Sequence, residues 1–125
     1  MAPELHSVIP ILRVFDVPKA DEFYLEYLGF KTDWEHRYDA NAPLYRQISH
    51  GALRLHLSEH HGDGSPGAKL RISTSNLAEY HAALTAKHYR YMRPGLDDGP
   101  AEGSKEMTVL DPFGNALIFC QEAKE

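Results

Sequence analysis

Residues 11–30 read ILRVFDVPKADEFYLEYLGF, and this stretch decides the fold. It opens with apolar residues typical of a strand, after which Asp16 and Pro18 supply a turn with a proline placed for a helix start. Apolar side chains then recur at three- and four-residue spacing up to Gly29, as in an amphipathic helix that ends at a glycine. The stretch therefore predicts a strand followed at once by a helix.

The same order of elements occurs twice along the chain. Three strand-like stretches follow the first helix, and a second strand and helix, with Asn76 as the predicted N-cap, come after them. A further strand is predicted near Tyr89–Met92, before two strands that flank a DPFGN turn. We therefore predict one domain, residues 1–125, made of two βαβββ repeats at about residues 7–60 and 67–122.

Composition limits the functions that the chain can have. A chain of 125 residues with 42% hydrophobic and 25% charged residues is typical of one soluble domain with its own core. The net charge of −5 is unfavourable for nucleic acid or an anionic membrane surface, so neither is expected as a partner. The apolar runs are too short to cross a bilayer and the N-terminus lacks signal-peptide features, which predicts a cytoplasmic location.

Alternation along the strands separates an apolar face from a polar face. In residues 53–58 the three leucines share one face, and in residues 69–72 Leu70 and Ile72 do the same. The apolar faces are expected to cover the helices, and the polar faces to line a cleft around which the two repeats curve. The predicted polar faces carry Arg54, His56 and Ser58 in the first repeat and Lys69 and Arg71 in the second.

A histidine-rich stretch, LHLSEHHGDG at residues 55–64, raises the question of a metal. Three histidines and two carboxylates are the ligand types that zinc, iron or nickel prefer, so a metal site, a catalytic site and a solvated loop are all open. His60 and His61 are adjacent, and adjacent side chains at a strand end point apart, which disfavours a shared ion. We expect His60 at the rim of the cleft.

Two stretches carry a resemblance to a known family. Residues 11–30 and EMTVLDPFGNALIF at residues 106–119 resemble the vicinal-oxygen-chelate superfamily, which includes glyoxalases, extradiol dioxygenases and bleomycin-resistance proteins. The likeness covers nearly the whole chain. It implies an α+β fold in which two βαβββ repeats form a curved mixed sheet with helices on the outer face.

The resemblance also implies where a metal would be held. Metalloenzymes of that superfamily place ligands on four strand positions, which match Ile9, His56, Lys69 and Ile118 here. Only His56 can coordinate a metal, because isoleucine has no donor atom and a protonated lysine repels a cation. A catalytic metal normally takes three protein ligands, so we expect no metal and no cofactor.

Without a metal, the chain is most similar to bleomycin-resistance proteins, in length, acidic charge and missing ligands. That likeness implies a homodimer, often with an exchanged N-terminal arm, that holds a cationic antibiotic in grooves between the subunits without altering it. Asp33 and Trp34 match groove positions, where a carboxylate attracts a cation and an indole stacks on the drug. Alternatively, Trp34 packs only at the subunit interface. The predicted role is antibiotic binding and resistance rather than catalysis.

Charge on the predicted cleft face leads to a different ligand. The face carries four basic residues, Arg13, Arg54, Lys69 and Arg71, and only Glu106 and Glu59 balance them. An excess of positive charge in a cleft favours a carboxylate or phosphate ligand. Alternatively, several of these side chains snorkel to the rim and pair with acidic residues of the partner subunit. The ligand-binding residues that we predict are Asp33, Trp34, Tyr38, Arg54, His56, Ser58, His60, Arg71 and Glu106.

Two other functions are open. The first is a glyoxalase-superfamily enzyme, lyase-like or dioxygenase-like, that acts on a small anionic substrate through Tyr38, Tyr45, His56 and Glu106 as acid and base groups. The sequence contains no glycine-rich phosphate loop, nucleophile elbow or Cys/His motif that would strengthen it. The second is a homodimer without ligand specificity, in which the tyrosines serve packing alone.

Overall fold

The computed structural model of the chain describes residues 2–123. The first repeat forms strand β1, a helix that begins as α1 and continues as η1, and three further strands. The second repeat has the same order. The elements are β1 (Ile11–Arg13), α1 (Val17–Ala20), η1 (Asp21–Tyr27), β2 (Lys31–His36), β3 (Tyr45–His50), β4 (Leu53–Ser58), β5 (Lys69–Ser73), α2 (Leu77–Ala86), β6 (Asp97–Asp98), β7 (Lys105–Leu110) and β8 (Ala116–Gln121).

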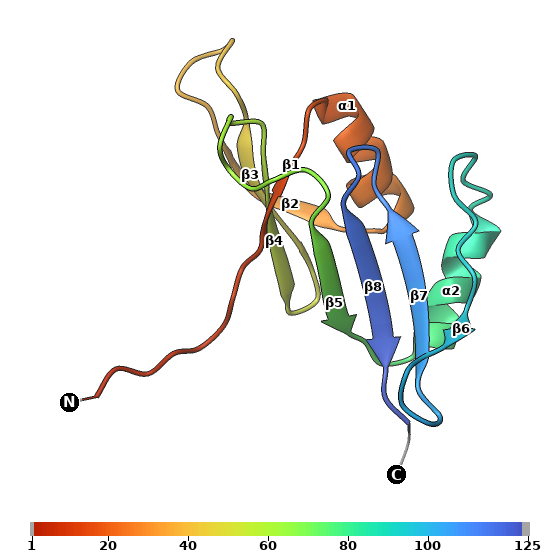
Figure 1. Cartoon of the computed structure of the whole chain (residues 1–125). Helices are drawn as coiled ribbons and strands as arrows, with labels where there is room; N and C mark the ends of the chain where they lie inside the picture. Colours follow the sequence, from red (N-terminus) through yellow and green to blue (C-terminus); the bar gives the residue numbers. More distant parts are fainter. Residues whose placement is uncertain (1, 124–125) are drawn as a thin grey trace.

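Each repeat contributes one four-stranded mixed sheet (Figure 1). The strand orders are β1-β4-β3-β2 in the N-terminal sheet and β5-β8-β7-β6 in the C-terminal sheet. In both sheets the first and last strands of the repeat pair in parallel, and the other neighbours are antiparallel. The predicted α+β fold of paired βαβββ repeats is confirmed, with the strands divided between two sheets rather than joined in one.

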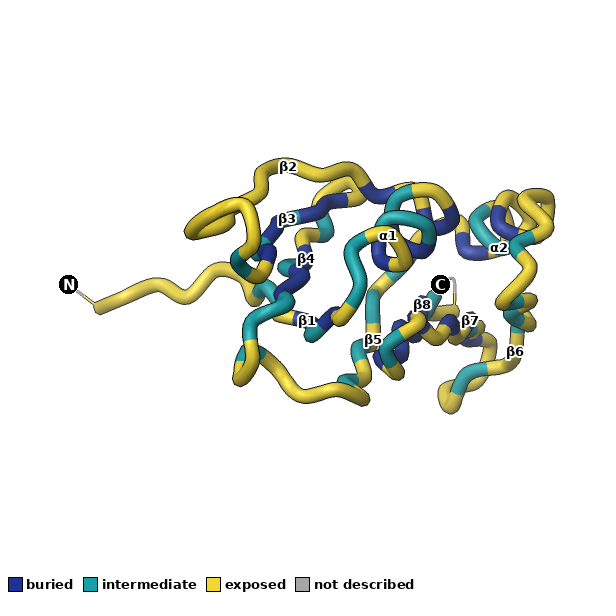
Figure 2. The backbone as a smooth tube through the Cα atoms, turned by 90° about the horizontal axis from the view of Figure 1, so that it is seen from above, coloured by how far each residue is buried: buried dark blue, intermediate teal, exposed yellow. Residues whose placement is uncertain are grey.

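The helices lie against the apolar faces of the sheets. Figure 2, which views the molecule from above, shows α1 in the angle between the two sheets and α2 further along the C-terminal sheet. Phe23, Tyr24 and Tyr27 of η1 are buried, and they belong to one hydrophobic cluster with side chains from both sheets and from α2. Burial of these faces is the main stabilising term of the fold.

Local signals fix both ends of the first helix. The side chain of Asp16 accepts a hydrogen bond from the backbone N–H of Lys19 at 2.9 Å, as an N-cap does. Gly29, with φ of 88°, ends the helix as predicted. Between them the helix widens, because the N–H of Leu28 donates to the carbonyl of Phe23, five residues back, at 2.9 Å.

The DPFGN turn fastens the two repeats together. The buried carboxylate of Asp111 accepts from the Tyr24 hydroxyl at 2.7 Å and from the backbone and side-chain N–H groups of Asn115 at 2.7 and 2.8 Å. The Asn115 amide also donates to the carbonyl of Arg13 at 3.1 Å and accepts from the N–H of Ala68 at 3.2 Å. One turn in the second repeat therefore contacts η1, β1 and the start of β5.

One strand prediction in the second repeat is wrong, and one helix-cap prediction is correct in position only. The strand predicted near residues 89–92 is absent there, and β6 instead pairs Asp97 and Asp98 with the start of β7. Tyr89, which suggested a strand, instead stacks on Tyr27 of η1, with 4.4 Å between the ring centroids. Its ring therefore packs against a helix and does not belong to a strand. Asn76 lies at the predicted N-cap position of α2, but its side chain makes no capping bond, and the Gln121 side chain accepts from the first helical N–H instead. None of the helices in the described range 2–123 has the length and apolar character needed to cross a bilayer.

Candidate ligand-binding face

The N-terminal sheet has one buried face and one face without a covering layer. Ile48, Leu55 and Leu57 point into the core and are almost fully buried. Because side chains alternate along a strand, their neighbours on β3 and β4 project to the other side. We call this side the open face; it carries Trp34, Tyr45, Gln47, Arg54 and His56.

A β-bulge in β2 brings two adjacent side chains to the open face. Thr32 pairs with Ile48, but Trp34 pairs with Gln47, so Asp33 is the extra residue in this strand. The Asp33 carboxylate then bonds to side chains of β3, while the Trp34 ring packs against Tyr45. Regular alternation would have sent Asp33 and Trp34 to opposite faces.

Aromatic rings form a continuous band across the open face. The rings of Trp34 and Tyr45 are nearly parallel, with centroids 6.0 Å apart, and His56 lies edge-on to both at 5.2 Å. Tyr38 and His60 extend the band, with 6.2 Å between their centroids. Trp34 is 43% exposed and Tyr38 80% exposed, so the band offers a broad apolar surface to a flat ligand.

A chain of hydrogen bonds links the Tyr45 and His56 rings to side chains of β2 and β3. Tyr45 Oη lies 2.7 Å from His56 Nδ1, and His56 Nε2 lies 3.0 Å from Gln47 Oε1. Gln47 Nε2 donates to Asp33 Oδ2 at 2.9 Å, and the Ser49 hydroxyl donates to Asp33 Oδ1 at 2.9 Å. We call the series Asp33, Gln47, His56 and Tyr45 the polar chain.

The surroundings of the polar chain set its charges at neutral pH. Partial burial, assisted by the Arg54 cation, lowers the pKa of His56 below its ordinary value of 6.5, so the imidazole is neutral. The hydrogen bond from Gln47 is the main factor that lowers the pKa of Asp33, which is therefore a carboxylate. Burial raises the pKa of Tyr45, with a further contribution from Asp63, so the phenol keeps its proton.

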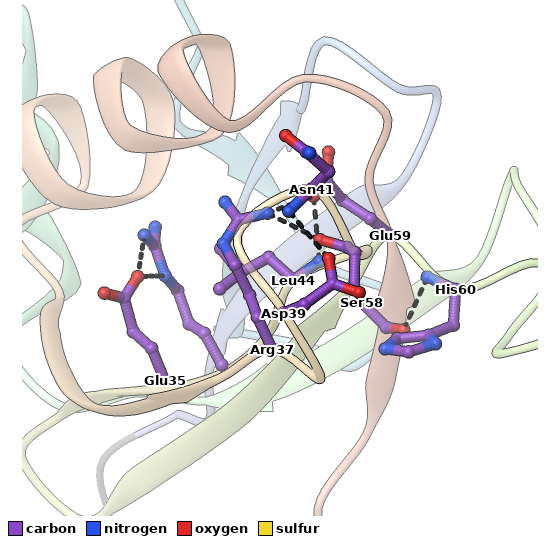
Figure 3. A network of polar contacts seen from close by, with 10 residues as sticks. Glu35, Arg37, Asp39, Asn41, Leu44, Ser58, Glu59 and His60 are labelled. Atoms are coloured by element: carbon purple, nitrogen blue, oxygen red, sulfur yellow. Dashed lines mark hydrogen bonds and ion pairs between the residues drawn. The ribbon is translucent and has the colours of Figure 1, made fainter.

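The loop after β4 is held by Ser58 and Glu59 (Figure 3). The buried Ser58 hydroxyl donates to Asp63 at 2.8 Å and accepts from the backbone N–H of His60 at 3.1 Å, which positions His60 beside the aromatic band. Glu59 accepts from the N–H of Leu44 at 2.9 Å and lies 3.8 Å from Arg37. Glu59 thus fixes the loop between β2 and β3. It pairs with Arg37, and not with the basic residues of the predicted cleft face that it was expected to balance.

The predicted ligand-binding residues fall into two groups. Arg71 and Glu106 lie on the C-terminal sheet and bond to each other at 3.2 Å. No hydrogen bond or ion pair links this pair to the open face within residues 2–123. The other seven lie on the N-terminal sheet or its loops: Asp33, Trp34, Tyr38, Arg54, His56, Ser58 and His60. Sequence reasoning missed Gln47 and Ser49, which can be found only once the register of β3 against β2 and β4 is known.

The family of the chain follows from comparison with known proteins. The profile of a family described as glyoxalase superfamily protein matches residues 4–125. The chain belongs to the glyoxalase superfamily. A search among curated proteins found no match.

Solved structures share the fold of this glyoxalase-superfamily chain. The bleomycin-binding protein of bleomycin-producing Streptomyces verticillus, solved with copper(II)-bleomycin, is 24% identical, with 99% of this chain and 100% of that chain covered and a TM-score of 0.68. TioX from Micromonospora is 16% identical, with 96% and 98% covered and a TM-score of 0.70. A glyoxalase/bleomycin resistance protein/dioxygenase superfamily member from Sphaerobacter thermophilus is 20% identical, with 94% and 98% covered and a TM-score of 0.66.

The residues of this glyoxalase-superfamily chain do not fit the divalent metal of the superfamily's enzymes. The strand register places Ile11, rather than Ile9, beside His56, and Arg71, rather than Lys69, beside Ile118. Both ring nitrogens of His56 already have partners, and the residue paired with it on β1, Ile11, has no donor atom. Among residues 2–123, no three side chains of the His, Cys, Asp and Glu types lie close enough to share an ion.

A separate hollow lies away from the open face. It has a volume of about 450 Å³ and lies beside η1, where Tyr89, Tyr91 and Met92 meet the end of β7. None of the nine predicted ligand-binding residues lines it. This hollow is the competing location for a ligand of this glyoxalase-superfamily chain, and experiments must distinguish it from the open face.

Proposed function

We propose that this chain is a metal-independent protein that binds a small molecule on the open face and sequesters it without altering it. The supporting observation is the band of partly exposed aromatic rings, two of which are held by the polar chain. Trp34 and Tyr45 offer large flat contact surfaces that lose little conformational entropy on binding. The polar chain holds Tyr45 and His56 in position before a ligand arrives, which lowers the cost of binding.

A second copy of the chain would close this site. Residues 2–8 are exposed and extend away from the sheets as an arm (Figure 2), with Leu5 95% and Val8 86% exposed. Ile11, on the edge strand β1, is also exposed and faces the same side as His56. Exposed apolar side chains next to an uncovered sheet face are typical of a subunit interface. We therefore include in the proposal a homodimer, with the arm exchanged and the ligand held between the copies.

The proposed ligand class is an aromatic antibiotic, and the proposed role is resistance in the cytoplasm. Support comes from the Streptomyces verticillus protein of the same fold, which was solved with copper(II)-bleomycin. The carboxylate of Asp33 next to the Trp34 ring suits a ligand with a cationic group. Arg54, which also faces this side, would select against ligands that carry only positive charge.

An enzyme that acts on a small anionic substrate receives less support. His56 and Glu106, predicted as an acid and base pair, lie on different sheets, and Glu106 bonds to Arg71. The raised pKa of Tyr45 and the lowered pKa of His56 leave both groups neutral near pH 7. Since both nitrogens of His56 have hydrogen-bond partners, a substrate would have to displace one of them.

Calorimetric titration tests the proposal, with metal-free bleomycin and a panel of aromatic carboxylic acids as probes. We expect saturable binding of at least one probe, about tenfold or more weakening in Trp34→Ala, and recovery of the probe unchanged. Tyr91→Ala is the matched control, because Tyr91 is an exposed aromatic residue beside the hollow near η1. Probe turnover would instead support an enzyme, and equal affinity in wild type and Trp34→Ala would remove the open face as the site.

A further inference from the structure

The polar chain has a direction, and that direction defines the kind of ligand the open face accepts. We infer that the hydrogen bonds run one way from Tyr45 to Asp33, so that the Tyr45 oxygen is left as an acceptor and selects flat aromatic ligands that carry an N–H or O–H donor. This inference rests on the proposed function, because it names the ligand class of the same site.

The direction is set at Asp33. An ionised carboxylate can only accept hydrogen bonds, and Asp33 accepts from Gln47 on one oxygen and from Ser49 on the other. A carboxamide has one donor end and one acceptor end. Since the NH₂ group of Gln47 faces Asp33, its oxygen must face His56, and the reverse orientation would place two oxygens against each other.

The amide oxygen of Gln47 then fixes the tautomer of His56. An acceptor 3.0 Å from Nε2 requires that Nε2 carries the proton. In a neutral imidazole the other nitrogen is then unprotonated and can only accept. Nδ1 therefore accepts from the hydroxyl of Tyr45 at 2.7 Å, which uses the single proton of that hydroxyl.

The oxygen of Tyr45 is the acceptor end of the chain, and Tyr45 is a partly exposed residue on the open face. His56 is the sole hydrogen-bond partner recorded for this hydroxyl within residues 2–123, so the lone pairs of the oxygen are available. Trp34 lies nearly parallel to the Tyr45 ring and is partly exposed. A ring packed on Trp34 can thus direct an N–H or O–H group to Tyr45, whereas a ligand acceptor at the same place would meet another acceptor.

Nuclear magnetic resonance of the free protein tests the direction without any ligand. Long-range ¹H–¹⁵N correlations, assigned to His56 by comparison with His56→Gln, should show the tautomer with the proton on Nε2 at pH 7.5. Asp33→Asn removes the acceptor-only group, so a mixture of tautomers is expected in that variant. Ser49→Ala is the matched control, since it removes a bond to Asp33 but leaves Gln47 in place. A proton on Nδ1 in the wild type would overturn the inference, as would an unchanged tautomer in Asp33→Asn.

A matched pair of probes tests the ligand class. Indole and benzofuran have nearly the same shape, but only indole carries an N–H donor. The indole signal of Trp34, the only tryptophan, reports binding in ¹⁵N-labelled protein. We expect indole to bind about three- to tenfold more tightly than benzofuran, and Tyr45→Phe to abolish the difference. Equal affinities in the wild type would overturn the ligand class. If neither probe binds, the ligand class is overturned, whereas the calorimetric titration with bleomycin decides the proposed function separately and the His56 tautomer decides the direction of the chain.

Discussion

Replacing Tyr24 with phenylalanine tests how strongly the two repeats are fastened together. Tyr24 is fully buried, and its hydroxyl donates to the buried carboxylate of Asp111 at 2.7 Å. Phenylalanine keeps the ring, which packs edge-on to Phe23 at 4.9 Å and to Phe30 at 6.3 Å. The substitution therefore removes one hydrogen bond between the repeats and little else.

The expected loss follows from what remains around Asp111. A hydrogen bond to a charged group contributes about 1.5–3 kcal/mol to stability. Asp111 keeps donors from its own turn, the N–H of Phe113 at 2.9 Å and two N–H groups of Asn115, so the carboxylate is not left unsatisfied. We expect Tyr24→Phe to lower the free energy of unfolding by about 1.5–2.5 kcal/mol, or the melting temperature by roughly 5–10 °C.

Urea unfolding followed by circular dichroism measures this loss. Tyr38→Phe is the matched control, because Tyr38 is 80% exposed and no hydrogen bond is recorded for its hydroxyl in the described chain. The control should lose less than about 0.5 kcal/mol. If Tyr24→Phe loses no more than Tyr38→Phe, the bond to Asp111 does not fasten the repeats and the reasoning fails.

Three further outcomes are expected. Gly64→Ala should destabilise the protein by at least about 1 kcal/mol more than Gly62→Ala. Both glycines have positive φ, but a Cβ at Gly64 would lie 2.8 Å from the carbonyl oxygen of Ile11, and one at Gly62 meets nothing within 4 Å; equal losses would contradict this. Because the pKa of His56 is lowered in the folded protein, this histidine binds protons more readily in the unfolded chain, which destabilises the folded wild type as the pH falls. The stability difference between wild type and His56→Gln should therefore shrink from pH 7 to pH 5. A constant difference would count against a lowered pKa. Ethylenediaminetetraacetate should leave the melting temperature unchanged, because the residues present do not fit a metal, and a decrease would argue for one.

Local signals made the element order predictable. Asp16 and Gly29 start and end the first helix through bonds and dihedral angles that depend on neighbouring residues alone. Leu55 and Leu57 enter the core and His56 does not, as alternation requires. These features need no knowledge of distant parts of the chain.

Features that depend on long-range pairing were not predictable. The bulge that puts Asp33 and Trp34 on one face arises from the register of β2 against β3, and alternation alone would separate them. The polar chain joins three strands, so the part played by Gln47 becomes visible only when those strands are aligned. The helix widens at η1, where it packs between the two sheets. The residues of the helix alone do not predict this widening, because it depends on how the sheets are arranged around it.

The most direct test of the ligand-binding face is to map where a ligand perturbs the chain. Metal-free bleomycin, added to ¹⁵N-labelled protein, should shift the indole signal of Trp34 and the backbone signals of Tyr45 and His56. Shifts confined to Tyr89 and Tyr91, beside the hollow near η1, or saturating binding that leaves the open face unperturbed, would contradict the account.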